Sequence, residues 1–91
     1  MYEVRLRSKR VQRELDSLRE SDYRRIVARL STLAEDARPP GCEKLYDSIY
    51  RVRVGDVRII YLVNDERKRI EVGAIRRRSE RTYGGLEELF P

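Results

Sequence analysis

The stretch that decides the fold reads Ile49-Tyr50-Arg51-Val52-Arg53-Val54-Gly55-Asp56-Val57-Arg58-Ile59-Ile60-Tyr61. Polar and apolar residues alternate in its first half, which predicts a strand, because successive side chains of a strand point to opposite faces. Gly55-Asp56 predicts a two-residue turn, since glycine adopts positive φ without steric cost. A hairpin with this turn pairs Val54 with Val57 and Arg53 with Arg58.

The predicted hairpin carries three arginines on one face. The period of two that governs a strand places Arg51, Arg53 and Arg58 on the same side of the sheet. Like charges directly opposite each other destabilise a sheet, so stability alone would not select this arrangement. The pattern therefore predicts that this face binds a polyanion.

Two helices are predicted between a first strand, over residues 2–6, and the hairpin. Ser8 is a candidate N-cap for the first helix, whose apolar stripe falls at i, i+4 and i+7, on Val11, Leu15 and Leu18. Ser21 and Asp22 are candidate caps for the second helix. Prolines at positions 39 and 40 end that helix, because proline lacks the amide donor. Its apolar face comprises Ile26, Leu30, Leu33, Ala34 and Ala37.

With a further strand over about residues 69–75, the predicted order is β-α-α-β-β-β in one domain over residues 1–91. This is an α+β fold, in which a two-helix hairpin packs on one face of a small, mainly antiparallel sheet. The opposite face, with the arginines, is expected to lie open as a concave basic surface. The sheet face expected against the helices carries Val52, Val54, Val57, Ile59, Tyr61 and Val63.

The charge of the chain is consistent with nucleic-acid contact. The 91 residues carry a formal net charge of +5, and only Lys9, Lys44 and Lys68 of the 21 basic residues are lysines. Arginine offers a planar fork that matches phosphate oxygens, and it also stacks on bases. For the helical arginines, nucleic-acid contact explains the excess about as well as genome composition and simple solvation do. For the arginines of the sheet face, function is the better explanation.

The sequence predicts a cytoplasmic protein that does not insert into a membrane. Cys42 is the single cysteine, which fits a reducing compartment, and no apolar run resembles a signal peptide or a membrane span. Because the chain has no histidine, a Ser-His-Asp triad is impossible. We also find no zinc-site spacing and no phosphate-binding glycine loop, so no cofactor is predicted.

Arginine and tyrosine remain as the residues that can carry chemistry. Cleavage of RNA by its own 2′-OH needs no metal; it needs aligned groups and charge stabilisation on the phosphorane. Arginine supplies the charge but is a poor base, since it stays protonated. Tyr83 is the candidate for proton transfer or for stacking a base. The alternative is a purely structural role, in which Tyr83 packs against the edge of the sheet.

Four segments in order resemble the RelE/ParE superfamily of bacterial and archaeal toxins, and the RelE branch most closely. The first is an approach with glycine followed by Lys-Leu, and the next two are the strands of the hairpin. A basic segment that ends in tyrosine closes the set. The segments are Gly41-Cys42-Glu43-Lys44-Leu45, residues 50–56, residues 57–61, and Arg76-Arg77-Arg78-Ser79-Glu80-Arg81-Thr82-Tyr83.

The resemblance implies a type II toxin that cleaves mRNA on the ribosome and is bound by a cognate antitoxin in a hetero-oligomeric complex. It carries catalytic roles to Arg51, Arg53, Arg58, Arg77 and Tyr83, with Arg76 and Arg78 as alternatives for the C-terminal arginine. It carries RNA contacts to Arg76, Arg78, Arg81 and Lys44. Two other functions stay open: a ParE-like toxin that poisons DNA gyrase without being a nuclease, and a non-toxic basic binding module.

Overall fold

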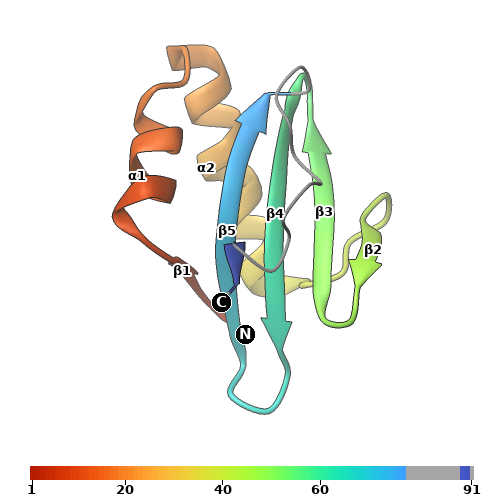
Figure 1. Cartoon of the computed structure of the whole chain (residues 1–91). Helices are drawn as coiled ribbons and strands as arrows, with labels where there is room; N and C mark the ends of the chain where they lie inside the picture. The colour runs from red at the N-terminus through yellow and green to blue at the C-terminus, as the bar shows by residue number, and fades with distance from the viewer. Residues whose placement is uncertain (78–88, 91) are drawn as a thin grey trace.

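The computed structural model describes residues 1–77 and 89–90. Within these residues, two helices and five strands follow the predicted order, with one additional strand before the hairpin (Figure 1). That strand was not predicted, because its four residues are mostly exposed and carry no clear alternation. The elements are β1 (Glu3–Leu6), α1 (Lys9–Asp16), α2 (Glu20–Glu35), β2 (Glu43–Tyr46), β3 (Ile49–Val54), β4 (Val57–Asn64) and β5 (Arg69–Arg77).

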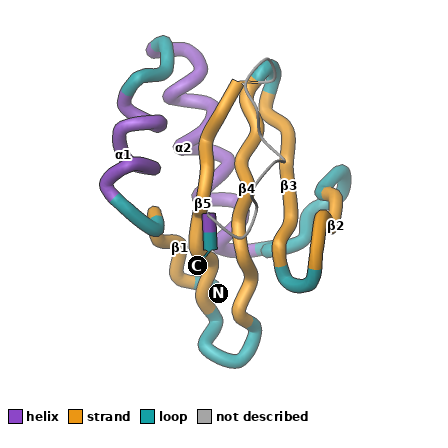
Figure 2. The backbone as a smooth tube through the Cα atoms, viewed as in Figure 1, coloured by secondary structure: helices purple, strands orange, loops and turns teal. Residues whose placement is uncertain are grey.

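The strands form one sheet in the order β1-β5-β4-β3-β2 (Figure 2). β1 pairs with β5 in parallel, and the other neighbouring pairs are antiparallel. Both helices lie on the same side of the sheet, as Figure 1 shows. The prediction of a two-helix layer on a mainly antiparallel sheet is therefore confirmed.

The predicted hairpin between β3 and β4 is confirmed in register. Arg53 lies opposite Arg58, and Val54 lies opposite Val57. Gly55 has a φ of 62°, the left-handed conformation that a two-residue turn requires of its first residue. The turn thus sets which face each side chain of both strands occupies.

The main core lies between the helices and the sheet. Tyr61 is fully buried in it, and its hydroxyl donates a hydrogen bond of 2.8 Å to the carbonyl of Ala37. Burial raises the pKa of the Tyr61 hydroxyl far above its ordinary value. The predicted sheet residues all belong to this core, with Val54 at its margin. Its buried members are Val11, Leu15, Ile26, Leu33, Ala37, Val52, Val57, Ile59, Tyr61, Val63, Ile70, Val72 and Ile75.

The start of α2 differs from the prediction. The helix begins at Glu20 with Arg19 at the N-cap, so the expectation that Ser21 or Asp22 caps it is wrong. Asp22 is buried inside the first turn and forms ion pairs with arginines instead. Ser8 does precede α1 in an extended conformation, but its side chain makes no capping hydrogen bond.

Side chains of α1 cover the edge of β5 beyond the end of β1. The pairing of β1 with β5 ends at Val72. Past that point, Arg10 donates a hydrogen bond of 2.8 Å to the carbonyl of Gly73, and the amide of Ile75 donates one of 3.1 Å to the carboxylate of Glu14. These two side chains, which also pair with each other, satisfy backbone groups that an edge strand would leave open.

A network of hydrogen bonds between polar side chains joins the N-terminal segment, the loop after α2 and the turn between β4 and β5. Arg38 donates two hydrogen bonds to Asp65, of 3.1 and 2.8 Å, and the hydroxyl of Tyr2 donates a third. Arg38 also donates to the hydroxyl of Tyr50 at 2.9 Å. The hydrogen bonds from Arg38 and Tyr2 lower the pKa of Asp65 to about 2.

The face of the sheet opposite the helices is not open along its whole length, and in this respect the prediction is wrong. Ile49, Ile60 and Ala74 are buried there together with Leu89. Gly73 lies directly under the ring of Phe90, since a Cβ at this glycine would stand 2.5 Å from the Cζ atom of that ring. Phe90 therefore packs on a second, smaller apolar cluster, to which Leu89 contributes.

Candidate nucleic-acid interface

Three arginines form a row across the middle strands, on the face opposite the helices. Arg53 of β3 lies opposite Arg58 of β4, and Arg58 lies opposite Arg76 of β5. Neighbouring strands are about 5 Å apart, so the Cα atoms of the row span roughly 10 Å. Such a row has the size and the charge to bind one or two phosphate groups of an RNA strand.

The three members of the row differ in their surroundings. Arg53 is exposed, and within the described residues no carboxylate pairs with it. Arg76 is half-buried, and its Nε atom donates a hydrogen bond of 2.9 Å to Glu14, the same carboxylate that holds the amide of Ile75. Arg58 lies between them, is half-buried and also interacts with another group of the protein. Positive charge is therefore most accessible at the β3 end of the row.

Arg51 shares this face but lies apart from the row. It stands opposite Ile60, and only 8% of its surface is exposed. Its guanidinium forms an ion pair with Glu43, its cross-strand neighbour on β2. The sequence predicted Arg51 on the right face, but its partner was missed because β2 was not predicted.

Arg77 points to the opposite side of the sheet from the row. It pairs in register with Val57, a residue of the main core, and its guanidinium lies 3.8 Å from the carboxylate of Asp22. Arg25 donates a hydrogen bond of 2.7 Å to the same carboxylate, and this bond is the chief reason why the pKa of Asp22 is lowered. Of the alternatives for the C-terminal site arginine, the structure brings Arg76 into the row and places Arg77 against α2.

The remaining predicted site residues are not part of the row. Lys44 is exposed on β2 opposite Tyr50, in register with the helix side of the sheet. Arg78, Arg81 and Tyr83 lie outside the described residues. Glu14 is the functional neighbour that sequence reasoning missed, although its position four residues after Arg10 on a predicted helix was a signal for an ion pair.

The arrangement supports phosphate binding and charge stabilisation. Guanidinium groups stay protonated, so the row can stabilise negative charge that develops on a phosphate but cannot accept a proton. No group of histidine, cysteine and acidic residues within the described part of the chain is placed to hold a metal ion. Neither of the described helices is long and apolar enough to cross a membrane.

Comparisons with known proteins agree with this fold. The family model of the ParE toxin of the type II toxin–antitoxin system, parDE, matches residues 6–82. Among solved structures, a chain of the archaeal RelE–RelB complex from Pyrococcus horikoshii OT3 is 31% identical, with a TM-score of 0.79; the match covers 88% of this chain and 98% of that one. The fold and these matches define a toxin of a type II toxin–antitoxin system. The chain belongs to the RelE/ParE superfamily of such toxins.

Two further structures share the fold at lower identity. The isolated RelE toxin of E. coli is 19% identical with a TM-score of 0.75, and the match covers 91% of this chain and 89% of that one. A chain of the RelBE2 toxin–antitoxin complex of Mycobacterium tuberculosis is 20% identical with a TM-score of 0.73, covering 85% and 98%. The sequence has no significant match among curated proteins.

Proposed function

We propose that this toxin is an endoribonuclease that cleaves mRNA on the ribosome. The observation that carries the proposal is the row of Arg53, Arg58 and Arg76 on the face of the sheet opposite α1 and α2. Three like charges side by side destabilise a sheet, so their placement is better explained by a polyanion that binds them. The 31% identity to a chain of an archaeal RelE–RelB complex also supports the RelE branch.

In the proposed reaction, the 2′-OH of a nucleotide loses its proton and its oxygen attacks the adjacent phosphate. The bond between phosphorus and the 5′-oxygen breaks, and that oxygen takes up a proton from water. Arg53 holds the phosphate from its exposed position. Arg58 and Arg76 stabilise the additional negative charge of the phosphorane, as preorganised donors do in other phosphate-transfer sites. Tyr83 is proposed to align or deprotonate the 2′-OH, or to stack the neighbouring base. The product is a 2′,3′-cyclic phosphate.

The proposed partner is an antitoxin with an acidic segment that folds when it binds. Two of the similar structures are complexes of a RelE-type toxin with its antitoxin, which supports a partner of this kind. A basic domain of this size buries a modest core, so binding of a partner to the folded state would raise its stability by mass action. Inside the cell we place the complex in the cytoplasm.

A second candidate function is poisoning of DNA gyrase. The family model that matches residues 6–82 is that of ParE toxins, and this match favours the second candidate. The two functions share a fold, so the fold does not separate them. They differ in their products: the nuclease leaves cleaved mRNA, whereas the gyrase poison leaves double-strand breaks in DNA.

The separating experiment uses purified toxin in two assays. In the first, ribosomes programmed with a defined mRNA are incubated with toxin, and cleavage is mapped by primer extension. In the second, gyrase is incubated with supercoiled plasmid and toxin, and trapped double-strand breaks are counted. Cleaved mRNA with intact plasmid supports the nuclease. Trapped gyrase without cleaved mRNA overturns the nuclease proposal in favour of the second candidate.

A further inference from the structure

Glu14 of α1 lies at the outer edge of β5, where three donors hold its carboxylate. The Oε1 atom accepts a hydrogen bond of 3.1 Å from the amide of Ile75. The Oε2 atom accepts one of 2.9 Å from the Nε atom of Arg76 and one of 3.0 Å from the Nη1 atom of Arg10. Only 19% of the Glu14 side chain is exposed, so little water competes for these bonds. The carboxylate is therefore fixed by the backbone and by two arginines together.

Glu14 in turn fixes the side chain of Arg76 relative to the strand that carries it. One oxygen of the carboxylate binds the backbone amide just before Arg76, and the other binds the Nε atom of Arg76. An arginine side chain has several rotatable bonds, and ordering them on ligand binding costs conformational entropy. In this protein much of that freedom is lost before a ligand binds. Arg76 is thus preorganised at the β5 end of the row of arginines.

The same contact offsets the repulsion within the row. Arg76 lies opposite Arg58, and like charges in this position repel each other. Glu14 sets a negative charge beside Arg76, on the edge of β5 that faces away from β4. Arg10 neutralises Glu14 and is itself anchored to the carbonyl of Gly73 by a hydrogen bond of 2.8 Å. Two guanidinium groups share one carboxylate, so the group keeps a net positive charge for an RNA phosphate.

We infer that Glu14 is the positioning residue for Arg76, and that it holds this guanidinium ready to stabilise the phosphorane. The inference rests on the proposed cleavage of RNA and adds a residue that acts on the reaction only through another. Glu14 is not a catalytic residue, because a carboxylate repels phosphate and both of its oxygens accept bonds from the protein. The opposite role would be sequestration, in which Glu14 withholds Arg76 from RNA and its removal speeds cleavage.

The kinetics of Glu14→Ala separate positioning from a purely structural role. On programmed ribosomes we expect kcat for mRNA cleavage to fall roughly tenfold or more, because Arg76 is no longer aligned with the phosphate. Binding of a labelled ten-nucleotide oligouridylate, measured by fluorescence anisotropy, should become tighter, since a negative charge beside the row is removed. Glu14→Gln, which keeps an acceptor oxygen, should recover part of the lost kcat.

Urea unfolding establishes that each variant is folded under the assay conditions. A purely structural role would lower the amount of active toxin and would not tighten the binding of oligouridylate. Unchanged or faster cleavage by folded Glu14→Ala would overturn the inference, the second outcome in favour of sequestration.

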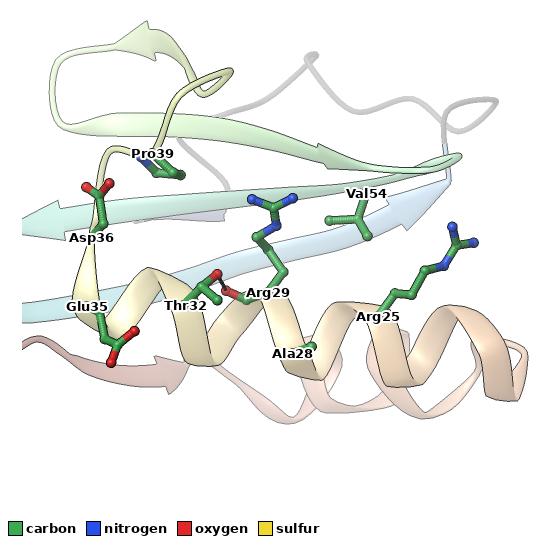
Figure 3. A pocket seen from close by; sticks show the side chains of 8 residues that line it. All are labelled: Arg25, Ala28, Arg29, Thr32, Glu35, Asp36, Pro39 and Val54. Carbon is green, nitrogen blue, oxygen red and sulfur yellow. Dashed lines mark hydrogen bonds between the residues drawn. The ribbon is translucent and has the colours of Figure 1, made fainter.

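A second background tests whether Glu14 acts through Arg76. When Arg76→Ala is already present, Glu14→Ala should change the cleavage rate less than about twofold, and a full further loss would overturn the inference. Glu35→Ala is the matched control, because it also removes one carboxylate. Glu35 is exposed near the end of α2 and lines a pocket between α2 and Val54 on the helix side of the sheet (Figure 3). This control should keep the kcat of the wild type.

Arg10→Ala tests whether Arg10 neutralises Glu14. In this variant the carboxylate is balanced by Arg76 alone, so oligouridylate should bind several-fold more weakly. Arg13→Ala, which removes an exposed arginine of α1, is the control for the change in net charge. Equal losses of affinity in the two variants would overturn this part of the inference.

Failure of the proposed function would be seen separately, as wild-type toxin that leaves programmed mRNA intact. The positioning of Arg76 is then decided by NMR of the arginine side chains. The Nε–H group of Arg76 should exchange slowly with water in the wild type and much faster in Glu14→Ala, because its acceptor is gone. Equal exchange rates in the two proteins would overturn the inference whether or not the toxin cleaves RNA.

Discussion

Arg76 and Arg77 are neighbours in β5, but their side chains serve opposite faces of the sheet. Arg76 lies opposite Arg58 and donates to Glu14 at the strand edge, whereas Arg77 lies opposite Val57 and pairs with Asp22 of α2. One belongs to the row of arginines, and the other ties the end of β5 to the helices. The two positions can therefore be separated by experiment.

We expect Arg58→Ala and Arg76→Ala to lower mRNA cleavage on programmed ribosomes by about a hundredfold or more, the usual cost of removing a preorganised donor. Arg77→Ala should instead lower the free energy of unfolding, because Asp22 is buried and loses one of its cationic neighbours. Single-turnover cleavage rates and urea unfolding measure the two effects, with Arg13→Ala as the control. Loss of cleavage in Arg77→Ala at unchanged stability would contradict this assignment.

The salt dependence of RNA binding tests the role of Arg53. Each phosphate contact to a single strand releases condensed counterions, so the slope of log K against log salt should fall by roughly 0.7 in Arg53→Ala. Fluorescence anisotropy of a labelled oligonucleotide at several salt concentrations gives the slope. Wild-type affinity that is flat across this range would argue against phosphate binding by the row.

The hydrogen bonds to Asp65 predict that the free energy of unfolding depends on pH. The pKa of this carboxyl is lowered to about 2 in the folded state, from an ordinary value near 3.8. Its contribution is therefore complete above about pH 4 and is lost as the pH falls through about 2. Asp65→Asn should have a lower urea midpoint than the wild type at pH 7, and the difference should shrink toward pH 2. Asp47→Asn, in the exposed turn before β3, should show no such change.

The contact between Gly73 and Phe90 predicts that the effects of substitutions at these two positions on stability are strongly coupled. A Cβ at Gly73 would meet the ring at 2.5 Å, so Gly73→Ala must move the ring or strain β5, at a cost of about 1–3 kcal/mol. In the Phe90→Ala background the same substitution should cost much less, and a double-mutant cycle by urea unfolding measures the difference. Equal costs in both backgrounds would mean that the ring does not rest on this glycine.

The sequence was most informative where one residue sets the register. Gly55 fixes a two-residue turn, and from it the alternation in β3 and β4 assigns every side chain to its face. β2 escaped prediction because an edge strand of four exposed residues has no apolar period to reveal it. The ion pair between Arg51 and Glu43 was not predicted for the same reason, since that contact exists only once β2 has paired with β3.

The choice between Arg76 and Arg77 could not be made from the sequence for a different reason. The pairing of β4 with β5 shifts between Ile60 and Tyr61, so Val72 and Ala74 face partners that are adjacent in β4. An extra residue in β5, at Gly73, breaks the period of two. Counting along the strand from its apolar first half therefore assigns the later residues to the wrong faces. Only the three-dimensional register places Arg76 in the row.

The parallel pairing of β1 with β5 affects when the nascent chain can fold during translation. β1 leaves the ribosome well before β5, which is the strand that β1 pairs with and which also brings Ile70, Val72 and Ile75 into the core. Long-range pairing of this kind delays folding until both segments exist. The arginine row cannot assemble before then, because Arg76 is translated last of its three members. The nascent chain therefore lacks the complete arginine row until β5 has been synthesised and has paired with β4.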